Sequence, residues 1–469
     1  MKKFNSSVFA IIIILIFISY LGIRTEPESV DHSAMISGPF TTPQDITKAC
    51  IGCHVDEAAD VLQSRHWLWL GEEYEADGKV MVRTGKRNGF NNTFININSN
   101  EESCTSCHPS FGWKDATFDF TNPENIDCLV CHDNSGIYNK LIRNGSAPFS
   151  GDDLLKAAQS VGKSKVSNCG TCHFERGGGK DLNHGGLEIA LLDDKKKLDV
   201  HMSEQGFDCV SCHKSENHKI KGAGHGSIAA GTNHISCTDC HDNNKKEIHR
   251  NKLLGRHLDA IACESCHIPS IAKENYTLTG WNWKTAGLKE DTNLDDAHLS
   301  YSKMRGDLNW EKNVKPVYRW FNGKADYYEI GDKFESQPIQ MNVLNGSISD
   351  SKAKIYPFKI IRGKQIYDVV NNYLIVPKLF GEDGFENGYD WNKAAENGMK
   401  SVNLAYSGKF DFVETVMLQP IHHMVAPKSQ AIKCTSCHSK NGIMDWNELG
   451  YSEDPMKKGG RVKNKLIKD

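Results

Sequence analysis

One long apolar run stands at the start of the chain. It covers residues 8–23, follows Lys2 and Lys3, and is broken only by a serine, a tyrosine and a glycine. A positive segment followed by an apolar run is typical of an export signal. As a helix the run would span roughly 24 Å, somewhat short of a bilayer core. No clear small-x-small cleavage site follows, so we favour a membrane anchor at 1–26 over a cleaved signal peptide. Either one places residues 27–469 outside the cytoplasm.

Alternation of apolar and polar residues is clearest between residues 271 and 420. The runs KADYYEI and YLIVPKLF predict short strands, and the Asn-Gly pairs at Asn322 and Asn345 predict turns. Aromatic residues are frequent in the same segment. Near the C-terminus the run NGIMDWNELGY predicts a short closing helix.

Composition limits what kind of core the chain can build. The 469 residues allow two or three domains, but 39% are hydrophobic and 40 are glycine, so an ordinary aliphatic core would be thin. The net charge of −3 gives no reason to expect nucleic acid as a partner. Six lysines and arginines in the last 14 residues predict a solvated basic tail.

The cysteines occur only as Cys-x-x-Cys-His units. There are eight such units, and they use all 16 cysteines, which leaves none for a disulfide or a catalytic thiol. The units are Cys50/Cys53/His54, Cys104/Cys107/His108, Cys128/Cys131/His132, Cys169/Cys172/His173, Cys209/Cys212/His213, Cys237/Cys240/His241, Cys263/Cys266/His267 and Cys434/Cys437/His438.

This spacing is the attachment motif of c-type haem. Zinc ribbons and thioredoxin-like sites also use Cys-x-x-Cys, but neither requires a histidine after the second cysteine. In c-type cytochromes the two thiols add to the haem vinyl groups, and the histidine becomes the proximal iron ligand. The sequence therefore predicts eight covalently attached c-type haems.

Seven motifs lie between His54 and His267, about one per 30 residues, and such segments are too short to bury a core of their own. We therefore expect a mainly α multihaem cytochrome fold, with much irregular structure around a stacked haem core and a small β content in the 270–420 region. The predicted divisions are the anchor at 1–26, a seven-haem core at 27–270, a haem-free aromatic cover at 271–420, and the eighth haem with a closing segment at 421–469.

Twelve histidines remain after the eight motif histidines, and each is a candidate sixth ligand. His32 is set aside because it lies near the anchor, and His298 because its acidic surroundings suggest a solvent-facing ring. His225 and His234 are reserves. The preferred distal ligands are His66, His184, His201, His218, His249, His257 and His423.

Several stretches without a role in haem attachment carry a resemblance to a known family. They include CHPSFGWKDATFDF, DCLVCHDNSG, VGKSKVSNCGTCHF, AKIYPFKIIRGK, AYSGKFDFVET and HHMVAPKSQAIKCTSCHSKNGIMDWNELGY. On these the chain resembles the octahaem tetrathionate reductase family of multihaem cytochromes c across nearly all of its exported part. The resemblance implies a periplasmic reductase with its active site at the second haem, attached here at Cys104 and Cys107 with His108.

The resemblance also implies a lysine as a ligand of that haem, from a glycine-rich segment after the fourth motif. Here the segment reads CHFERGGGKDLNHGG, and Asn183 stands at the position expected for the lysine. Either Lys180 reaches the iron or the position stays open, and we favour Lys180 near the iron. Asp181 is the candidate for the acidic residue that accompanies the lysine in the family.

The predicted reaction is the reduction of a small anion or nitrogen compound, with tetrathionate, nitrite and hydroxylamine as candidates. The alternative is a conduit in which every iron is held by two histidines and only passes electrons. Lys354, Lys359, Arg362 and Lys364 are candidates for lining an anion channel. The generic electron donor for such a reductase is a quinol-oxidising cytochrome of the inner membrane.

Overall fold

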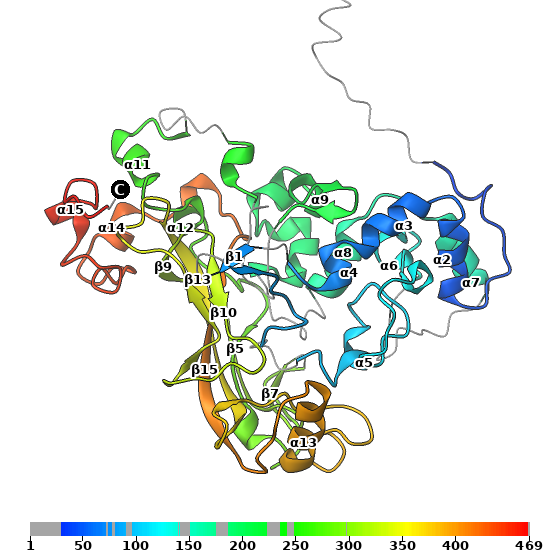
Figure 1. Ribbon diagram of the computed structural model, residues 1–469. Coiled ribbons are helices and arrows are strands. Elements are labelled where there is room, and N and C mark those ends of the chain that lie inside the picture. The colour runs from blue at the N-terminus through cyan, green and yellow to red at the C-terminus, as the bar shows by residue number, and fades with distance from the viewer. Residues whose placement is uncertain are drawn as a thin grey trace, which may run out of the picture.

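The structure is a computed structural model that describes residues 30–71, 74–76, 80–90, 96–138, 140, 151–174, 186–222, 235–241, 248–296 and 298–467. The predicted anchor lies outside these residues. Within them, no helix has both the length and the apolar character that a membrane crossing requires. Short helices occupy one side of the molecule, and a twisted sheet occupies the other (Figure 1).

The first half of the chain consists of short helices joined by irregular segments. Its helices are α2 (Pro43–Ile51), α3 (Val55–Leu62), α4 (Arg65–Leu68), α5 (Glu101–Cys104), α6 (Leu129–His132), α7 (Gly151–Gln159), α8 (Val166–His173), α9 (Cys209–Cys212), α11 (Lys252–His257) and α12 (Cys263–His267). The strands described before residue 270 form two small hairpins, β1 (Tyr74–Ala76) with β2 (Val80–Val82) and β3 (Ser215–Glu216) with β4 (Lys219–Ile220).

Helix α2 shows how local sequence sets these elements. Thr42 caps its first turn by accepting a hydrogen bond from the backbone N–H of Asp45, and the Asp45 carboxylate accepts from the N–H of Thr42 in return. Pro43 fits the first turn because it lacks the N–H that would otherwise have no partner there. Ile46 is fully buried on the inner side of the helix.

The second half contains a nine-stranded mixed sheet. Its path runs β11 (Ile339–Gln340), β15 (Phe410–Pro420), β13 (Lys354–Asp368), β5 (Thr277–Asn282), β8 (Gly306–Glu311), β7 (Leu299–Ser302), β6 (Thr292–Asn293), with β9 (Val317–Phe321) and β14 (Tyr373–Leu374) also pairing with β13. A separate pair joins β10 (Ala325–Tyr327) to β12 (Asn342–Leu344). The later helices are α13 (Trp391–Ser401), α14 (Cys434–Cys437) and α15 (Pro455–Lys458).

This sheet is larger than the sequence patterns predicted. The fold is only moderately helical and contains a sizeable mixed sheet. The difference comes mainly from β13, whose 15 residues pair with β15 along 11 positions from Phe358 to Asp368. The segment AKIYPFKIIRGK, which suggested an anion channel, forms most of this central strand. In the two Asn-Gly pairs Gly323 and Gly346 both have positive φ, which glycine adopts without strain, but neither pair forms a regular turn.

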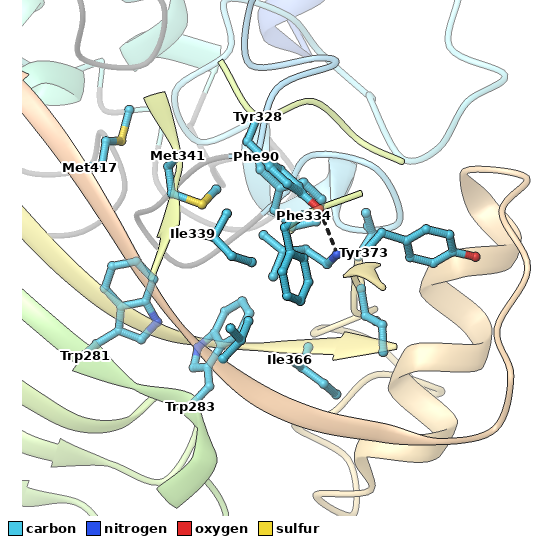
Figure 2. Close-up of a cluster of buried hydrophobic side chains, with 14 of the residues drawn as sticks. Phe90, Trp281, Trp283, Tyr328, Phe334, Ile339, Met341, Ile366, Tyr373 and Met417 are labelled. Atoms are coloured by element: carbon cyan, nitrogen blue, oxygen red, sulfur yellow. Dashed lines mark hydrogen bonds between the residues drawn. The ribbon is translucent and has the colours of Figure 1, made fainter. Parts of the chain in front are cut away.

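An aromatic core lies between the sheet and its covering loops. Trp281, Trp283 and Phe334 are buried there, and Phe90 reaches in from the N-terminal half (Figure 2). The Phe90 N–H donates to the carbonyl of Tyr328 at 3.0 Å. The core therefore joins the two halves of the chain.

Two smaller expectations are wrong. Residues 441–451 form turns and not a closing helix, with the Tyr451 N–H donating to the Trp446 carbonyl. His298 does not face solvent: it is 6% exposed and packs against Tyr276 and Trp310, while its Nδ1 lies 3.0 Å from an Asp295 carboxylate oxygen. A partner carboxylate explains why a histidine in an acidic stretch can be buried.

Candidate haem sites

Each Cys-x-x-Cys-His motif forms about one helical turn. The N–H of His54 donates to the carbonyl of Cys50 at 2.8 Å, and His438 bonds to Cys434 in the same way. Because residues three and four apart lie on the same side of a helix, this turn directs both thiols and the ring to one side. The sixteen cysteines are all free thiols in the structure.

The thiols are not equally buried. Cys240 of the sixth motif is exposed, as is the neighbouring ring of His241. This motif forms a 3-10 turn over Cys237–Asp239, and Cys240 follows the turn. Haem attachment at Cys240 stays a prediction, at a surface position. The other exposed thiols are Cys53, Cys131, Cys212 and Cys434.

Seven of the eight motif histidines face a second histidine from elsewhere in the chain. The ring centres in these pairs lie 6.1–6.4 Å apart. The pairs are His32 with His54, His66 with His173, His132 with His218, His201 with His241, His213 with His423, His249 with His267, and His257 with His438.

This spacing fits one iron between two imidazoles. With metal–nitrogen bonds of about 2 Å and about 1 Å from each nitrogen to its ring centre, two rings on one metal stand about 6 Å apart. Direct packing of two rings has no such requirement and covers a range of about 4.5–7 Å. The seven ring-centre distances differ by no more than 0.3 Å. They therefore match the spacing expected for two imidazoles on one haem iron.

Most of the histidines proposed as distal ligands lie in these pairs. His66, His201, His218, His249, His257 and His423 each face a motif histidine, whereas His184 and the reserves His225 and His234 lie outside the described residues. The pairs are not local in sequence. His66 follows the first motif but faces the histidine of the fourth.

His32 is the distal candidate that the sequence analysis set aside. The structure places its ring 6.2 Å from His54, at the first motif. Gln159 in α7 holds this N-terminal segment by donating to the carbonyls of Ser33 and Ile36. His32 was set aside because it lies near the predicted anchor in the sequence. The contact with Gln159, which is distant in sequence, holds the segment around His32 close to the first motif.

Asp199 joins two loops that carry paired histidines. Its side chain is 4% exposed and accepts from the N–H of His201 at 2.8 Å, at the start of a π-helical turn over Val200–Glu204. Its other oxygen accepts from the N–H of Val425 at 2.8 Å, two residues after His423. One buried carboxylate thus fixes the backbone beside His201 and beside His423.

Contacts between thiols give the order of the motifs in space. Motif one contacts motif three through Cys50 and Cys128, two contacts four through Cys107 and Cys172, four contacts five through Cys169 and Cys209, and six contacts seven through Cys237 and Cys263. Weaker electrostatic interactions place motif three near four, five near six (Cys212 with Cys240), and seven near eight. The motifs therefore form one row, with the second beside the fourth.

The second motif differs from the other seven. His108 is fully buried among aromatic side chains, and the nearest ring centres are those of Trp113 at 4.6 Å and Trp69 at 5.0 Å. No other histidine ring in the described part of the chain lies at the pair spacing from it. Its Nε2 lies 2.6 Å from the Trp67 carbonyl, and its Nδ1 lies 2.7 Å from the Ser110 hydroxyl.

The two hydrogen bonds of His108 indicate which of its ring nitrogens carries the proton. A carbonyl can only accept a hydrogen bond, so Nε2 carries the proton and Nδ1 accepts from Ser110. Burial lowers the pKa of His108 to about 3, so the ring is neutral. A metal-binding nitrogen must be free of its proton. His108 stays the predicted proximal ligand of the second haem, and ligation through its Nε2 would replace the hydrogen bond to the Trp67 carbonyl.

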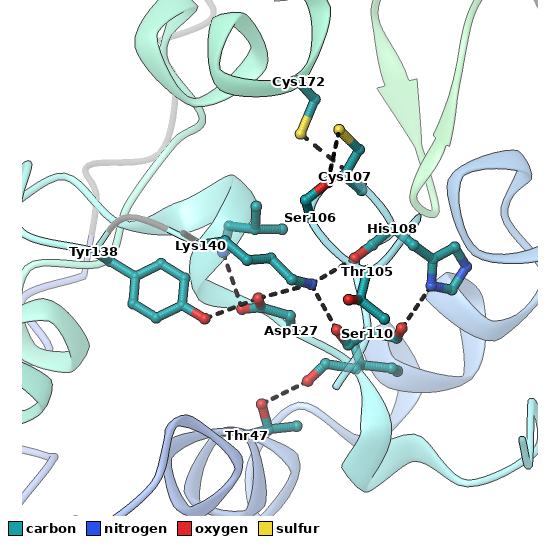
Figure 3. A network of polar contacts seen from close by, with 12 residues as sticks. Thr47, Thr105, Ser106, Cys107, His108, Ser110, Asp127, Tyr138, Lys140 and Cys172 are labelled. Atoms are coloured by element: carbon teal, nitrogen blue, oxygen red, sulfur yellow. Dashed lines mark hydrogen bonds and ion pairs between the residues drawn. The ribbon is translucent and has the colours of Figure 1, made fainter. Parts of the chain in front are cut away.

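A buried ion pair lies beneath the His108 loop. The Lys140 ammonium lies 3.2 Å from the Asp127 carboxylate and donates to the carbonyls of His108 and Ser110 at 2.5 and 2.6 Å (Figure 3). Tyr138 donates to the same carboxylate at 2.8 Å, and burial raises the pKa of Tyr138. Since Asp127 directly precedes the third motif, this network connects the second and third motifs. Nothing in the sequence pattern singled out Lys140.

The comparisons with known proteins agree with this geometry. A family model described as bacterial cytochrome c matches residues 279–441. An uncharacterized protein of Archaeoglobus fulgidus is 26% identical over an alignment of 248 positions, which takes in 42% of this chain and 83% of that protein. The crystal structure of octahaem cytochrome c from Shewanella oneidensis is 42% identical, with a TM-score of 0.84, and the match covers 91% of this chain and 98% of that one.

This chain belongs to the octahaem cytochrome c family. It is a multihaem c-type cytochrome, and the paired histidines and free thiols fit the c-type haems that such a protein carries. The bacterial cytochrome c match falls mostly on the sheet and not on the motif-rich half. Most of the sheet therefore lies within the part of the chain that this family model matches.

Two cations lie beside the second motif of this cytochrome, and sequence reasoning missed them. The Lys86 ammonium lies 5.0 Å above the Trp69 ring and interacts electrostatically with Cys104. The Arg87 guanidinium lies 4.4 Å above Phe120, and burial lowers its pKa. Both residues come from the turn TGKRNG. Two adjacent cations between glycines were the feature of the sequence that could have indicated an anion-binding turn.

The four cations proposed for an anion channel do not share one face. Lys359 lies on the buried side of β13, where its Nζ donates to Thr277 at 2.7 Å and burial lowers its pKa to about 7. Lys354, Arg362 and Lys364 are partly or fully exposed on the other side, where Lys364 pairs with Glu414 at 3.0 Å. A strand directs alternate residues to opposite faces, so odd and even positions separate. The remaining catalytic candidates, Lys180, Asp181 and Asn183, lie outside the described residues.

Proposed function

We propose that this protein is an extracytoplasmic octahaem reductase that reduces a small anion or nitrogen compound at its second motif. Tetrathionate, nitrite and hydroxylamine are the candidate substrates. The proposal depends mainly on one observation: seven motif histidines face a second histidine, whereas His108 at the second motif is held by Trp67 and Ser110.

This difference separates two roles. When bound, each haem supplies an iron centre that exchanges one electron at a time. Each of the seven histidine pairs would hold its iron with two imidazoles, which would leave no place for a substrate. The second motif lacks such a pair among the described residues, so a substrate can be accommodated there. Its position beside the fourth motif connects it to the row of pairs.

The charges at the second motif favour an anionic substrate. Lys86 and Arg87 bring two positive side chains to the same aromatic cluster that encloses His108. Hydrogen-bond donors and cations in a partly buried site stabilise negative charge more strongly than they do in water. We assign to these residues the binding and orientation of an oxyanion.

The ligand of the second iron is proposed to come from the segment 175–185. Lys180 is the proposed axial ligand, with Asp181 nearby and Asn183 at the position where the resemblance implies a lysine. An amine binds a metal only when it is deprotonated, so burial near a ferric iron would have to lower the pKa of Lys180. Replacing Lys180 with Met tests this: an unchanged spectrum of the second haem would exclude Lys180.

Location and electron donor complete the proposal. The positive and apolar N-terminal segment directs residues 27–469 out of the cytoplasm, where c-type haems are attached. The proposed donor is a quinol-oxidising cytochrome of the inner membrane, which residues 1–26 would place within reach if they remain as an anchor.

The test is electron paramagnetic resonance of the oxidised holoprotein, with and without nitrite. We expect one signal that differs from the bis-histidine signals and that responds to nitrite. Mass spectrometry should find eight attached haems. If every iron gives a low-spin signal that does not change when nitrite is added, the protein is an electron conduit and the reductase proposal fails.

A matched pair of variants tests the anion site. Lys86→Ala with Arg87→Ala should raise the KM for nitrite or tetrathionate by about tenfold or more, with a smaller change in kcat, because the cations act in binding. Lys114→Ala, an exposed lysine on the following loop, is the control. Equal KM values for the two proteins would contradict the assignment.

A further inference from the structure

The seventh and eighth motifs lie at one end of the molecule. Figure 1 shows α11, α12 and α14 together at this end, with the helices of the first motif, α2 and α3, at the other. Helix α11 contributes to both sites: His249 precedes it and faces His267, and His257 ends it and faces His438. A single short surface segment therefore carries the partner histidines of two neighbouring sites.

The outer side of this segment is unusual for a soluble surface. Leu253 is 58% exposed and Leu254 is 36% exposed. Arg250, Lys252 and Arg256 are exposed around them, and none makes an ion pair with another residue that the structure describes. The sequence from 248 to 257 contains no carboxylate. We call Arg250, Lys252, Leu253, Leu254 and Arg256 the α11 surface.

The neighbouring eighth motif adds to the same character. Cys434, one of its two attachment thiols, is exposed, and so is the loop that precedes it at Lys428. The first motif also has an exposed thiol, Cys53, but acidic residues follow it: Asp56 and Glu57 start α3. Helix α3, after the first motif, therefore starts with two carboxylates, whereas residues 248–257 carry three cationic side chains and no carboxylate.

We propose that the α11 surface is the docking surface for an acidic redox protein that donates single electrons to the eighth site. The inference rests on the proposed function, because a reductase needs an electron donor. The α11 surface would be the place where electrons enter the row of paired histidines. In each encounter one electron leaves the reduced centre of the partner, one ferric iron becomes ferrous, and no bond forms or breaks.

The physics of transient complexes fits this surface. Electron-transfer encounters use small, weak interfaces in which a few apolar contacts are ringed by charge. Complementary charge raises association rates by roughly 10- to 1,000-fold at low ionic strength, and salt removes the effect. The two leucines supply the apolar centre, and the three cations select an acidic partner. The two histidines at either end of the segment connect this surface to two sites.

The experiment follows the reduction of the full holoprotein in a stopped-flow instrument. The probe is reduced flavodoxin, an acidic one-electron donor, mixed without any substrate at several ionic strengths. Arg250→Glu, Lys252→Glu and Arg256→Glu are combined in one variant. Lys195→Glu, Lys400→Glu and Lys409→Glu, three exposed lysines elsewhere, make the control with the same change of charge.

We expect the α11 variant to lose at least about tenfold in the second-order rate at low salt, whereas the control loses less than about threefold. The second-order rate of the α11 variant should also no longer decrease with increasing salt concentration, because the attractive charges have been removed. Dithionite, a small reductant, should reduce both variants at the same rate, which shows that the haems are intact. Equal rates with flavodoxin for the two variants would overturn the proposal.

A second variant protects the test against misfolding. Lys252→Glu with Leu253→Asn changes positions at least three residues from either histidine, and it should lose severalfold in rate at all salt concentrations because an apolar contact is lost as well. Because no substrate is present, these rates do not depend on the reductase proposal. Unchanged rates in both α11 variants with an intact nitrite response would refute the docking surface alone. The expected loss of rate with no nitrite response in any variant would refute the reductase alone.

Discussion

Asp454 offers a direct test of how the chain sets the reduction potential of one site. His438 of the eighth motif has its Nδ1 2.6 Å from the Asp454 carboxylate, and both side chains are largely buried. The corresponding nitrogens of His132 and His213 bond to the backbone carbonyls of Gly162 and Lys221 at 2.9 Å. An anion close to a ligand histidine favours the ferric state over the ferrous state, so it lowers the reduction potential.

The structure gives the magnitude. Allowing for the width of the ring and a metal–nitrogen bond of about 2 Å, the Asp454 carboxylate lies about 7 Å from an iron bound at the other nitrogen of His438. At an effective dielectric constant of about 20, one charge at that distance changes the energy by about 2 kcal/mol. For a one-electron couple this corresponds to about 100 mV, and partial solvent screening reduces it to about 50–100 mV.

Replacing Asp454 with Asn removes the charge and keeps the geometry. The Asn oxygen can still accept from the His438 ring and from the N–H of Met456, which Asp454 caps at 2.8 Å. A redox titration followed by electron paramagnetic resonance should show one site raised by about 50–100 mV and the others unchanged. Asp445→Asn is the control, because Asp445 caps Glu448 in the same segment but touches no paired histidine. A shift below about 20 mV, or equal shifts at several sites, would refute the reasoning.

Two further predictions concern buried charges elsewhere. Asp199→Ala should alter the resonance signals of two haems together, because Asp199 holds two histidine loops, whereas Asp193→Ala, which removes an exposed helix cap, should alter none. A change confined to one signal would disprove the shared role. Burial lowers the pKa of Lys359 to about 7, below its unfolded value of 10.5, so native stability should rise with pH between these values. Lys359→Met should therefore raise Tm most below pH 7 and little at pH 10, and Lys364→Met should show no such pH dependence; a uniform change across pH would contradict the buried charge.

The sequence predicted the motifs, which depend on residue type at fixed spacing, and most of the histidines that the structure places in pairs. Six of the seven preferred distal histidines lie in pairs, and the seventh, His184, lies outside the described residues. The failures come from contacts distant in sequence. His32 is brought to His54 by Gln159, and His298 is buried by Tyr276 and Trp310.

The sheet was underestimated for a related reason. Strand β13 pairs with β15 across a separation of more than 40 residues, and its alternation is masked by Lys359 and Gln365 on the buried side. Polar residues in a strand interior weaken the alternating pattern by which a strand is recognised. Their partners, Thr277 and Thr415, become visible only when the neighbouring strands are in place.

The sequence by itself determined the chemistry of attachment, because two thiols and a histidine within one helical turn form a local unit that needs no distant partner. Only the tertiary structure decided which histidine faces which motif, that Cys240 lies at the surface, and that His108 turns to Trp67 and Ser110. These outcomes depend on backbone groups and rings brought together by folding, and local spacing does not encode them. The distinction between seven similar sites and one different site is therefore a property of the packing.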